Sequence, residues 1–506
     1  TGSGKTEVYF EAVAAALRAG RQVLVLLPEI ALTAQFIDRF EARFGDRPAE
    51  WHSEIPANRR GRVWRGVLSG EVRIVVGARS ALFLPFTDLG LVVIDEEHEA
   101  AYKQEDRVWY NARDMAVVRA RFADAEVVLA SATPSIETRH NADEGRYHRL
   151  HLPDRFGGRD LPEVGVVDMR TEAPERGRWL SPPVVQSLIE CLEAGRQGLL
   201  FLNRRGYAPL TLCRKCGHRF ECPDCTSWLT EHRFRHELMC HHCGYRIPTP
   251  ENCPKCGESD ALVACGPGVE RVAEEVAERF PDARKMIMSS DVMGGPAALR
   301  DRFAMIETGE VDIVVGTQLI AKGHNFPGLS FVGVVDADMG LGMGDLRATE
   351  RTFQLLSQVV GRAGRGNDPG HALIQTYMPE HPVLKTLVSG DSEAFYAREI
   401  EARRSAHLPP FSRLAAIIVS GKDRIETRDF AAHLSRIAPR QMAGIEILGP
   451  AEAPLAMVRG RYRIRFLVKA DRQIRVQPVI AAWLSKAGRP RGSLRIAVDI
   501  DPYSFL

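Results

Sequence analysis

Short apolar runs alternate along this chain with longer segments in which apolar residues recur at helical spacing. Runs of the first kind lie at residues 23–27, 72–77, 91–94 and 125–130, and again at 198–202, 313–316, 329–336 and 371–376. Apolar runs of this length, alternating with helices, predict parallel strands that are buried on both faces. The pattern stops and then restarts across residues 142–180. We therefore predict an α/β protein in which two parallel-sheet lobes face each other.

The segment Leu91–His98 carries the first candidate chemistry, because its apolar run ends in two carboxylates. Asp95, at the tip of a buried strand, is placed to hold Mg²⁺, and Glu96 to orient the water that attacks a γ-phosphate. His98 is either a surface histidine or a sensor beside the nucleotide, and its position after the acids favours the sensor. Alone, the segment is more typical of a strand before a solvated acidic helix start.

A glycine-rich opening segment reverses that preference. Its residues Gly2, Ser3, Gly4, Lys5 and Thr6 match the end of a phosphate loop. Backbone N–H groups of such a loop hold phosphate oxygens at a helix N-terminus, the lysine reaches the β- and γ-phosphates, and the threonine hydroxyl binds Mg²⁺. The first glycine of the pattern would precede Thr1. We therefore expect an internal segment of a longer protein, with weak ATP hydrolysis of its own.

The second lobe contributes arginines near its end, in the segment Gln358–Arg365. Arg362 and Arg365 stand three residues apart, so on a helix they share one face. Directed at the nucleotide, they would act as arginine fingers. The alternative is a solvated arginine pair beside a glycine turn. Gln358, four residues before Arg362, favours the catalytic role and is itself a candidate nucleotide contact.

Two polar loops are candidates for coupling ATP to a nucleic acid. Ser131 and Thr133 end the strand at 125–130 and are either a plain strand-to-turn junction or a hinge between hydrolysis and grip. Thr317, Gln318 and Lys322 follow a strand of the second lobe. We predict that they contact DNA.

Aromatic residues follow the acidic signature. Tyr102, Trp109 and Tyr110 are interleaved with charged residues such as Lys103 and Arg107. Such residues either pack against a neighbouring helix or stack on bases while the cations pair with phosphates. The sequence favours neither interpretation over the other.

The cysteines indicate metal rather than disulfides, because eight of the ten fall in four Cys-x-x-Cys pairs between Cys213 and Cys256. Four thiolates bind one zinc tetrahedrally, so eight make two structural zinc sites with no open position for catalysis. Three pairings of the four units are possible. The alternating segment at 227–239 predicts a hairpin that joins the middle two units. This nested scheme puts one zinc on Cys222, Cys225, Cys240 and Cys243, and the other on Cys213, Cys216, Cys253 and Cys256.

The last part of the chain alternates strands and helices in another order. Strands at 414–420, 445–449, 462–469 and 494–500 with helices at 423–437 and 472–486 predict a β-α-β-β-α-β, ferredoxin-like α+β domain. Alternate positions of the third strand are arginines: Arg459, Arg461, Arg463 and Arg465. They form either a solvated face or a contact for an anionic partner, and the lack of compensating acids favours the partner.

Length and composition set the remaining bounds. The chain has 506 residues, of which 45% are hydrophobic and 26% charged, as in ordinary globular proteins. A net charge of +2 predicts no partner, and no apolar run is long enough for a membrane span. We expect a first lobe at 1–141, a linker at 142–180, a second lobe at 181–380 with the insert at 211–258, and a C-terminal DNA- or partner-binding domain at 381–506.

Together the segments GSGKT, DEEH, SATPS, GTQLIAKGH and QVVGRAGR resemble the motifs of superfamily 2 helicases. The eight-cysteine insert and the strings GARSALFLPF, FLNRRGYAP, KGHNFPGLSFVGVVDAD and VDIDPYSFL narrow this to a resemblance to the PriA family of bacterial replication-restart helicases. The resemblance implies two RecA-like P-loop NTPase lobes and an N-terminal DNA-binding region that precedes the phosphate loop. It also implies two zinc ions, a DNA-coupling role for the aromatic segment, and a cytoplasmic, nucleoid-associated location.

The implied function is ATP-driven 3′→5′ unwinding of DNA at stalled or abandoned forks, with Mg²⁺ and ATP. The implied partners are forked and single-stranded DNA, single-stranded DNA-binding protein, and primosome proteins that load the replicative helicase. Two alternatives stay open from the residues alone. One is a zinc-stabilised DNA-binding scaffold with a weak motor, against which the intact carboxylates and arginines argue. The other is a translocase that moves along duplex DNA without separating its strands.

Overall fold

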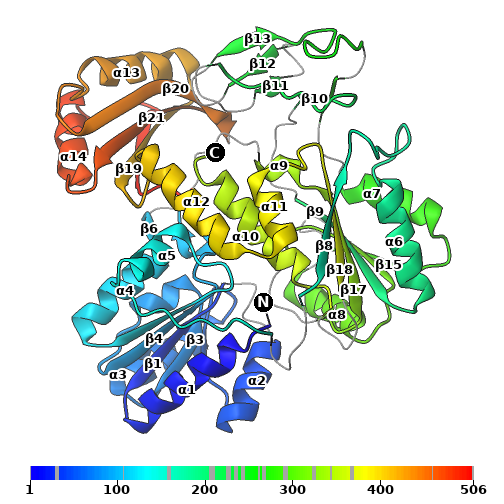
Figure 1. Cartoon of the computed structure of the whole chain (residues 1–506). Coiled ribbons are helices and arrows are strands. Elements are labelled where there is room, and N and C mark those ends of the chain that lie inside the picture. The colour runs from blue at the N-terminus through cyan, green and yellow to red at the C-terminus, as the bar shows by residue number, and fades with distance from the viewer. Residues whose placement is uncertain are drawn as a thin grey trace.

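The computed structural model describes residues 2–28, 34–105, 108–155, 161–203, 211–223, 229–232, 237–240, 245–259, 262–264, 269–288, 295–321, 326–341, 345–364, 370–458 and 460–503. Two parallel-sheet lobes, a cysteine-rich insert and a C-terminal α+β domain make up these ranges (Figure 1). Among the helices described, none has the length and apolar character needed to cross a membrane.

The first lobe is a parallel sheet of order β2-β3-β1-β4-β7. Its central strand β1 is buried throughout, with alternate residues in two separate cores, because helices cover both faces of the sheet. The strands are β1 (Gln22–Leu26), β2 (Ala49–Trp51), β3 (Ile74–Gly77), β4 (Leu89–Asp95) and β7 (Glu126–Ala130). The helices are α1 (Lys5–Arg18), α2 (Ala34–Phe44), α3 (Ala57–Ser69), α4 (Ala112–Ala123) and α5 (Ile136–Asp143).

Between β4 and α4 the chain leaves the sheet. It makes a 3₁₀ turn, η3 (Ala100–Tyr102), and a short antiparallel pair, β5 (Lys103–Gln104) and β6 (Tyr110–Asn111). A second 3₁₀ turn, η2 (Arg79–Phe83), follows β3. The segment after the acidic signature is therefore a small hairpin that projects from the strands' C-terminal edge.

The second lobe is also a parallel sheet, of order β15-β16-β9-β17-β18-β8. Central strand β9 is fully buried and divides its side chains between two cores. The strands are β8 (Glu163–Asp168), β9 (Gln197–Leu202), β15 (Lys285–Met288), β16 (Ile313–Gly316), β17 (Leu329–Asp336) and β18 (His371–Thr376). The helices are α6 (Pro182–Glu193), α7 (Val269–Arg279), α8 (Gly295–Glu307), α9 (Asp338–Leu341), α10 (Ala348–Val360), α11 (Pro382–Ser389) and α12 (Ser392–Ser405).

Two expected boundaries of this lobe need correction. The segment 142–180, expected to be a linker, contains β8, which pairs in register with β18 and forms the edge of the sheet. Its short apolar run is too brief to stand out among prolines and glycines. The helices at 382–405, expected in the C-terminal domain, place Val383, Leu384 and Phe395 in the core of the second lobe. This lobe therefore spans about 163–405.

Helices α10 to α12 lie between the two lobes, and α12 packs against α5 of the first lobe (Figure 1). Tyr396 on α12 donates a hydrogen bond to the backbone oxygen of Pro134 at 2.8 Å. Phe353 and Phe395 stack with ring centroids 3.9 Å apart and join α10 to α12. The end of the first lobe is thus held by helices of the second.

The C-terminal domain has the predicted β-α-β-β-α-β order. Its antiparallel sheet runs β20-β21-β19-β22, and both helices pack on one face. The elements are β19 (Ser412–Gly421), α13 (Arg424–Arg436), β20 (Ile445–Val458), β21 (Arg461–Asp471), α14 (Val476–Ala487) and β22 (Arg495–Ile500). Each predicted strand and helix is present, and the ferredoxin-like arrangement is confirmed.

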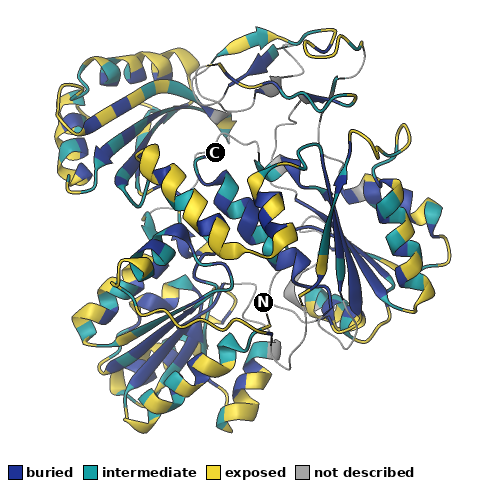
Figure 2. Cartoon of the chain, viewed as in Figure 1, coloured by how far each residue is buried: buried dark blue, intermediate teal, exposed yellow. Residues whose placement is uncertain are grey.

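The insert is built from short antiparallel strands. They are β10 (Thr211–Cys213), paired with β14 (Leu262–Ala264), and β11 (Thr230–His232), β12 (Glu237–Met239) and β13 (Arg246–Pro248), which form a small sheet. The pairing of β11 with β12 confirms the predicted hairpin. Figure 2 shows that the sheets of the two lobes and of the C-terminal domain are largely buried. The insert has two small buried clusters of its own.

Candidate active site and metal centre

The phosphate loop ends where α1 begins. Gly2 and Gly4 have φ angles of 81° and 84°, a backbone conformation that glycine adopts without strain. Gly4 is the N-cap of α1, and its backbone oxygen accepts the N–H of Glu7 at 2.9 Å. Lys5 and Thr6 follow in the first turn and are partly exposed. The loop thus presents a helix N-terminus and a cation, as a phosphate requires.

Strand β4 delivers the acidic pair to the same edge of the first lobe. Asp95 is the last residue of β4, and its Oδ2 accepts the hydroxyl of Tyr9, from α1, at 3.1 Å. The hydroxyl of Tyr102 donates to the backbone oxygen of Asp95 at 2.7 Å and to that of Leu26 at 3.0 Å. Glu96 has a φ of 47°, unusual for a residue with a side chain. The turn at Glu96 is therefore held against local strain, as active-site residues often are.

The pKa values of the two carboxylates are shifted in opposite directions. Burial, followed by the neighbouring charge of Glu96, raises the pKa of Asp95 to about 6. Burial alone would also raise the pKa of Glu96, but nearby positive charge, from Lys5 first and also from Arg362, outweighs it and lowers that pKa. Glu96 is thus kept ionised by cations from both lobes. A divalent cation at Asp95 would favour its ionised form as well.

A hydrogen-bonded chain crosses from the second lobe to the first at this point. Gln358, buried on α10, donates through Nε2 to the Nε2 of His98 at 2.9 Å and lies 3.4 Å from Oε2 of Glu96. Because Nε2 of His98 accepts, its proton is on Nδ1, which lies 2.7 Å from Oγ of Ser131. That oxygen also accepts the backbone N–H of Thr133 at 3.0 Å. Gln358 therefore joins the second lobe to His98, Ser131 and Thr133 of the first lobe.

Arg362 is near enough to Glu96 to lower its pKa, but it does not lie on the helix that was expected to carry it. Helix α10 ends at Val360, with Gly361 as its C-cap, so Arg362 stands in the following turn. The prediction that Arg362 and Arg365 share a helical face is therefore wrong for Arg362, since the glycine interrupts the helix first. Arg362 is 6% exposed, and its Nη2 donates to the backbone oxygen of Ala321 at 2.5 Å. Arg365 lies outside the described residues.

The second coupling loop approaches the same turn. Ala321, the acceptor for Arg362, ends the described part of the segment that begins with Thr317. Thr317 is buried, and Gln318 donates to Oδ1 of Asn203 at 3.3 Å. Lys322 lies outside the described residues. The structure thus brings the loop against the arginine turn, and its DNA contacts stay a prediction.

The aromatic segment divides into a structural and an accessible part. Tyr102 is 1% exposed and bonded to two backbone oxygens, so it braces the end of β4 and cannot stack on bases. The expectation of a DNA contact is therefore corrected for Tyr102, whose burial was not evident beside so many charged residues. Trp109 and Tyr110 are partly exposed, and Tyr110 packs edge-on against Phe83 with centroids 5.2 Å apart.

Glu97, the residue after the acidic pair, was not predicted to have a role. It is 2% exposed and accepts from the backbone N–H of Ser135 at 2.6 Å, from the hydroxyl of Thr138 at 3.0 Å and from Arg113 at 3.1 Å. Ser135 is the N-cap of α5. Glu97 therefore fixes the acidic signature to the start of α5. The sequence did contain a signal for this role, because Glu97 is a third acid directly after the two that are expected to act on the nucleotide.

A buried cluster of charges continues this connection into the second lobe. Glu350, on α10, accepts the backbone N–H of Ile136 at 2.9 Å, Nη2 of Arg403 at 2.8 Å and Nη1 of Arg347 at 3.3 Å. Arg347 also pairs with Glu137 at 2.5 Å. Burial alone would raise the pKa of Glu350, but Arg403 and Arg347 lower it. The cluster joins α5 of the first lobe to α10 and α12 of the second.

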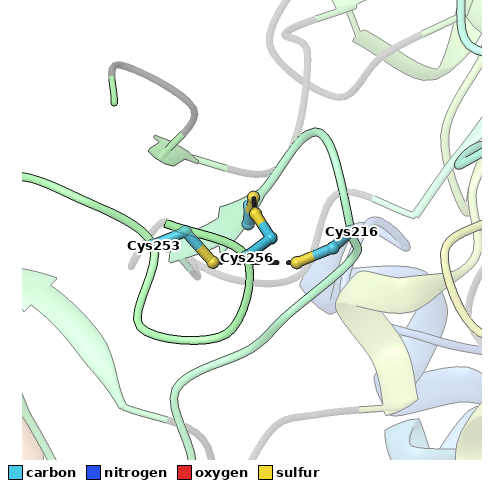
Figure 3. Close-up of side chains that lie close together, drawn as sticks. Cys216, Cys253 and Cys256 are labelled. Atoms are coloured by element: carbon cyan, nitrogen blue, oxygen red, sulfur yellow. Dashed lines mark hydrogen bonds between the residues drawn. The ribbon is translucent and has the colours of Figure 1, made fainter. Parts of the chain in front are cut away.

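Four cysteines of the insert gather into one cluster. The Sγ atoms of Cys213, Cys216, Cys253 and Cys256 all lie within 4.8 Å of one another (Figure 3). Cys213 and Cys256 are 3.6 Å apart and Cys216 and Cys253 3.7 Å. A tetrahedron with zinc–sulfur bonds of about 2.3 Å places its sulfurs about 3.8 Å apart, so this donor set fits zinc.

The local backbone explains why these cysteines converge. In both pairs the N–H of the first cysteine bonds to the residue five positions on, and the glycine after the second cysteine has a positive φ. The N–H of Cys240 makes the same bond, to Tyr245 at 2.8 Å. Cys222 and Cys240 are buried in one small core. Cys225 and Cys243 lie outside the described residues, so the second set stays a prediction. Cys191 is buried elsewhere, in α6.

The arginine face of β21 is not the open surface that a solvated stripe would be. Ile464 and Phe466 are buried in the domain core, which confirms the alternation. On the other face, burial lowers the pKa of Arg465 to about 10, although the charge of Asp345 raises it. Burial likewise lowers the pKa of Arg463. This face is turned toward the rest of the protein. Arg459 lies outside the described residues.

Three family models match the chain. They are the DEAD/DEAH box helicase at residues 1–142, the PriA DNA helicase Cys-rich region domain at 222–248, and the primosomal protein N C-terminal domain at 404–503. The middle match covers the second set of cysteines.

Relatives match over essentially the whole of this chain. The chain is 46% identical over 505 residues to the replication restart protein PriA of Rickettsia felis, covering 100% of this chain and 78% of the relative. It is 39% identical to that of Bacillus subtilis, with 100% and 63% covered, and 38% identical to that of Haemophilus influenzae, with 99% and 68% covered.

Solved structures resemble the chain more distantly. One is RecG bound to a three-way DNA junction, at 15% identity and a TM-score of 0.43, covering 80% of this chain and 46% of the other. Another is the DUF1998 helicase MrfA bound to DNA and AMPPNP, at 15% identity and a TM-score of 0.44, covering 79% and 47%.

Proposed function

The chain belongs to the PriA family of bacterial replication restart proteins, and from that membership we propose how its two lobes use ATP to act on DNA. It is an ATP-dependent DNA helicase of replication restart that carries a zinc-binding cysteine region. ATP with Mg²⁺ binds between Gly2–Thr6 and Asp95. Lys5 contacts the β- and γ-phosphates, and Thr6 and Asp95 hold the Mg²⁺.

Hydrolysis uses groups from both lobes. Glu96, kept ionised by its cationic neighbours, orients the attacking water. Arg362 supplies positive charge where the transition state develops negative charge, and Arg365 is the second candidate for that role. Mg²⁺, when bound, neutralises charge on the phosphates. The observation that carries the proposal is the contact of Gln358, from the second lobe, with both Glu96 and His98 in the first.

The same contact gives a route from ATP to DNA. When the lobes separate after hydrolysis, Gln358 leaves His98, and Ser131 and Thr133 lose the far end of their hydrogen-bonded chain. We infer that this change alternates the grip of Thr317, Gln318, Lys322, Trp109 and Tyr110 on one DNA strand. Movement in the 3′→5′ direction is part of the proposal and is supported by the family resemblance.

Metal and partner assignments complete the proposal. One zinc binds the four clustered cysteines, and a second binds Cys222, Cys225, Cys240 and Cys243, both in structural roles. The DNA substrates are forked and single-stranded. Single-stranded DNA-binding protein and primosome proteins, including a loader of the replicative helicase, are the protein partners that the family resemblance supports.

Three variants of the full-length protein test the assignments. Lys5→Ala should lose ATP binding, whereas Glu96→Gln and Arg362→Ala should bind ATP yet hydrolyse it at least about a hundredfold more slowly with DNA present. Lys385→Ala, an exposed lysine on α11, is the control and should match wild type. In the variants that lose ATP hydrolysis, strand displacement on forked DNA should be lost as well. Unchanged turnover in all three variants would refute the roles, and ATP turnover without displacement would favour a duplex translocase.

A further inference from the structure

The last described residues of the C-terminal domain reach into the ATP site's surroundings. Tyr503 is 5% exposed, and its hydroxyl donates to the backbone oxygen of His98 at 2.7 Å. His98 is the residue whose side chain accepts from Gln358 and bonds to Ser131. Tyr503, from the C-terminal domain, therefore holds the backbone of His98. Among the described residues, His98 is the histidine that connects the motifs of the two lobes.

A second contact fixes the same segment to the first lobe. Lys103, at the start of β5, is buried and donates to the backbone oxygens of Ile500 at 2.9 Å and Asp501 at 3.1 Å. It also forms an ion pair of 2.7 Å with Asp499, whose side chain is 3% exposed. Lys103 begins the hairpin that carries Trp109 and Tyr110. The end of β22 is thus attached both to the acidic signature and to the base of the aromatic hairpin.

The second lobe contacts the same tyrosine from the other side. The guanidinium groups of Arg347 and Arg351 lie 5.0 and 5.1 Å from the centroid of the Tyr503 ring, within the range of cation–π attraction. Arg347 directly precedes α10 and Arg351 is in its first turn, and Gln358 is on the same helix. Tyr503 therefore touches the element of each lobe that carries part of the ATP site.

From this three-way contact we propose that Tyr503 is a positioning residue of the ATPase, and that the segment Asp499–Tyr503 transmits the state of the C-terminal domain to His98. The inference rests on the proposed function, because it assigns a regulator to the same site. It extends the role of the C-terminal domain from binding to control. The segment directly continues β22, one of the two edge strands of the sheet, so a shift of the domain on DNA moves the segment with it.

The hydrogen bond from Tyr503 to His98 can be removed without removing the tyrosine ring. The ring of Tyr503 is held by packing and by two arginines, and its hydroxyl adds one directed bond to His98. Removing the hydroxyl alone leaves the ring in place and frees the His98 backbone. One buried hydrogen bond contributes about 1 kcal/mol, which corresponds to about a fivefold change in rate if it is needed in the transition state.

The test is Tyr503→Phe in the full-length protein, with Tyr462→Phe as the matched control. Tyr462 is in the same domain, and no hydrogen-bond partner for its hydroxyl is found among the described residues. The rate of ATP turnover is measured while the concentrations of forked DNA and of ATP are varied separately. We expect kcat at saturating DNA to fall about fivefold in Tyr503→Phe, while KM for ATP, the Kd for DNA, zinc content and the thermal midpoint stay within error of wild type. The control should show none of these changes.

Other outcomes separate the two hypotheses. An unchanged kcat in Tyr503→Phe, with wild type still stimulated by DNA, overturns the inference and leaves the proposed function intact. A fall in kcat accompanied by a lower thermal midpoint or weaker ATP binding also overturns it, because the tyrosine is then only structural. If wild type itself hydrolyses no ATP with DNA, the proposed function fails first.

Discussion

Glu350→Gln is the substitution that most directly tests the buried charge cluster between the lobes. Glu350 is 1% exposed and accepts hydrogen bonds from Arg347, Arg403 and the backbone N–H of Ile136. Glutamine keeps the length and one acceptor oxygen but removes the charge. The backbone bond to Ile136 can therefore survive, whereas both arginines lose part of their compensation.

The magnitude follows from what each arginine retains. Breaking a buried ion pair by removing one partner costs about 3–5 kcal/mol when the remaining charge has no other partner. Here Arg347 keeps Glu137 at 2.5 Å and Arg403 keeps Glu399 at 2.9 Å. We therefore expect a cost below that range, about 2–3 kcal/mol, in the contact between the lobes.

The assay compares urea unfolding and DNA-stimulated ATP turnover of Glu350→Gln with those of Glu401→Gln. Glu401 is on α12, and its pair with Arg404 is exposed on both sides, at 62% and 55%. Exposed pairs of this kind contribute well under about 1 kcal/mol, so the control should be almost neutral. Equal unfolding midpoints for the two variants would refute the argument that the buried cluster holds the lobes together.

Two further predictions concern zinc and pH. Cys253→Ser should lower bound zinc from two ions to one per chain by atomic absorption, whereas Cys191→Ser, which changes a buried cysteine outside the cluster, should leave both. His381 caps α11 by accepting the N–H of Val383, and burial, aided by Arg219 and Arg398, lowers its pKa to about 4. Below about pH 6.5 the unfolded chain takes up a proton that folded His381 refuses, so stability should fall as pH drops toward 4, by at most about 3 kcal/mol. His381→Asn, which keeps a capping side chain, should show a shallower fall in chemical denaturation, and equal slopes would contradict this assignment.

The sequence predicted the local chemistry well because each signature is short and tied to a strand end. Asp95 and Glu96 follow a continuous apolar run, and the edge of a parallel sheet is where such residues can meet a nucleotide. The ferredoxin-like domain was equally predictable, because its strands and helices follow one another in a distinct order and β21 alternates regularly between buried and partly exposed positions. The strand β8 was not, because six residues amid prolines and glycines give little periodicity.

The pattern of hydrophobic and polar residues could not predict contacts between distant segments. Tyr102 sits among charged residues, and only the fold shows its ring in the core. Glu97 and Glu350 are acidic residues in helical or turn contexts where solvent exposure is the usual expectation. Glu97 binds Arg113, 16 positions away, and Glu350 binds Arg403, 53 positions away, and the backbone of Ile136, 214 positions away on the other lobe. One sequence contains no record of such pairs.

These unpredicted contacts connect the first lobe, the second lobe and the C-terminal domain, and this connection bears on the mechanism. Glu97 fixes the acidic signature to α5, Glu350 fixes α5 to α10, and Tyr503 touches both the signature and the start of α10. They form a closed path around Gln358 and His98. Because buried charges have few alternative partners, this path favours a small number of discrete arrangements over gradual bending. The two lobes and the C-terminal domain should therefore switch together when ATP is hydrolysed, and loosening any one of the three contacts should reduce DNA-stimulated turnover without removing the ability to bind ATP.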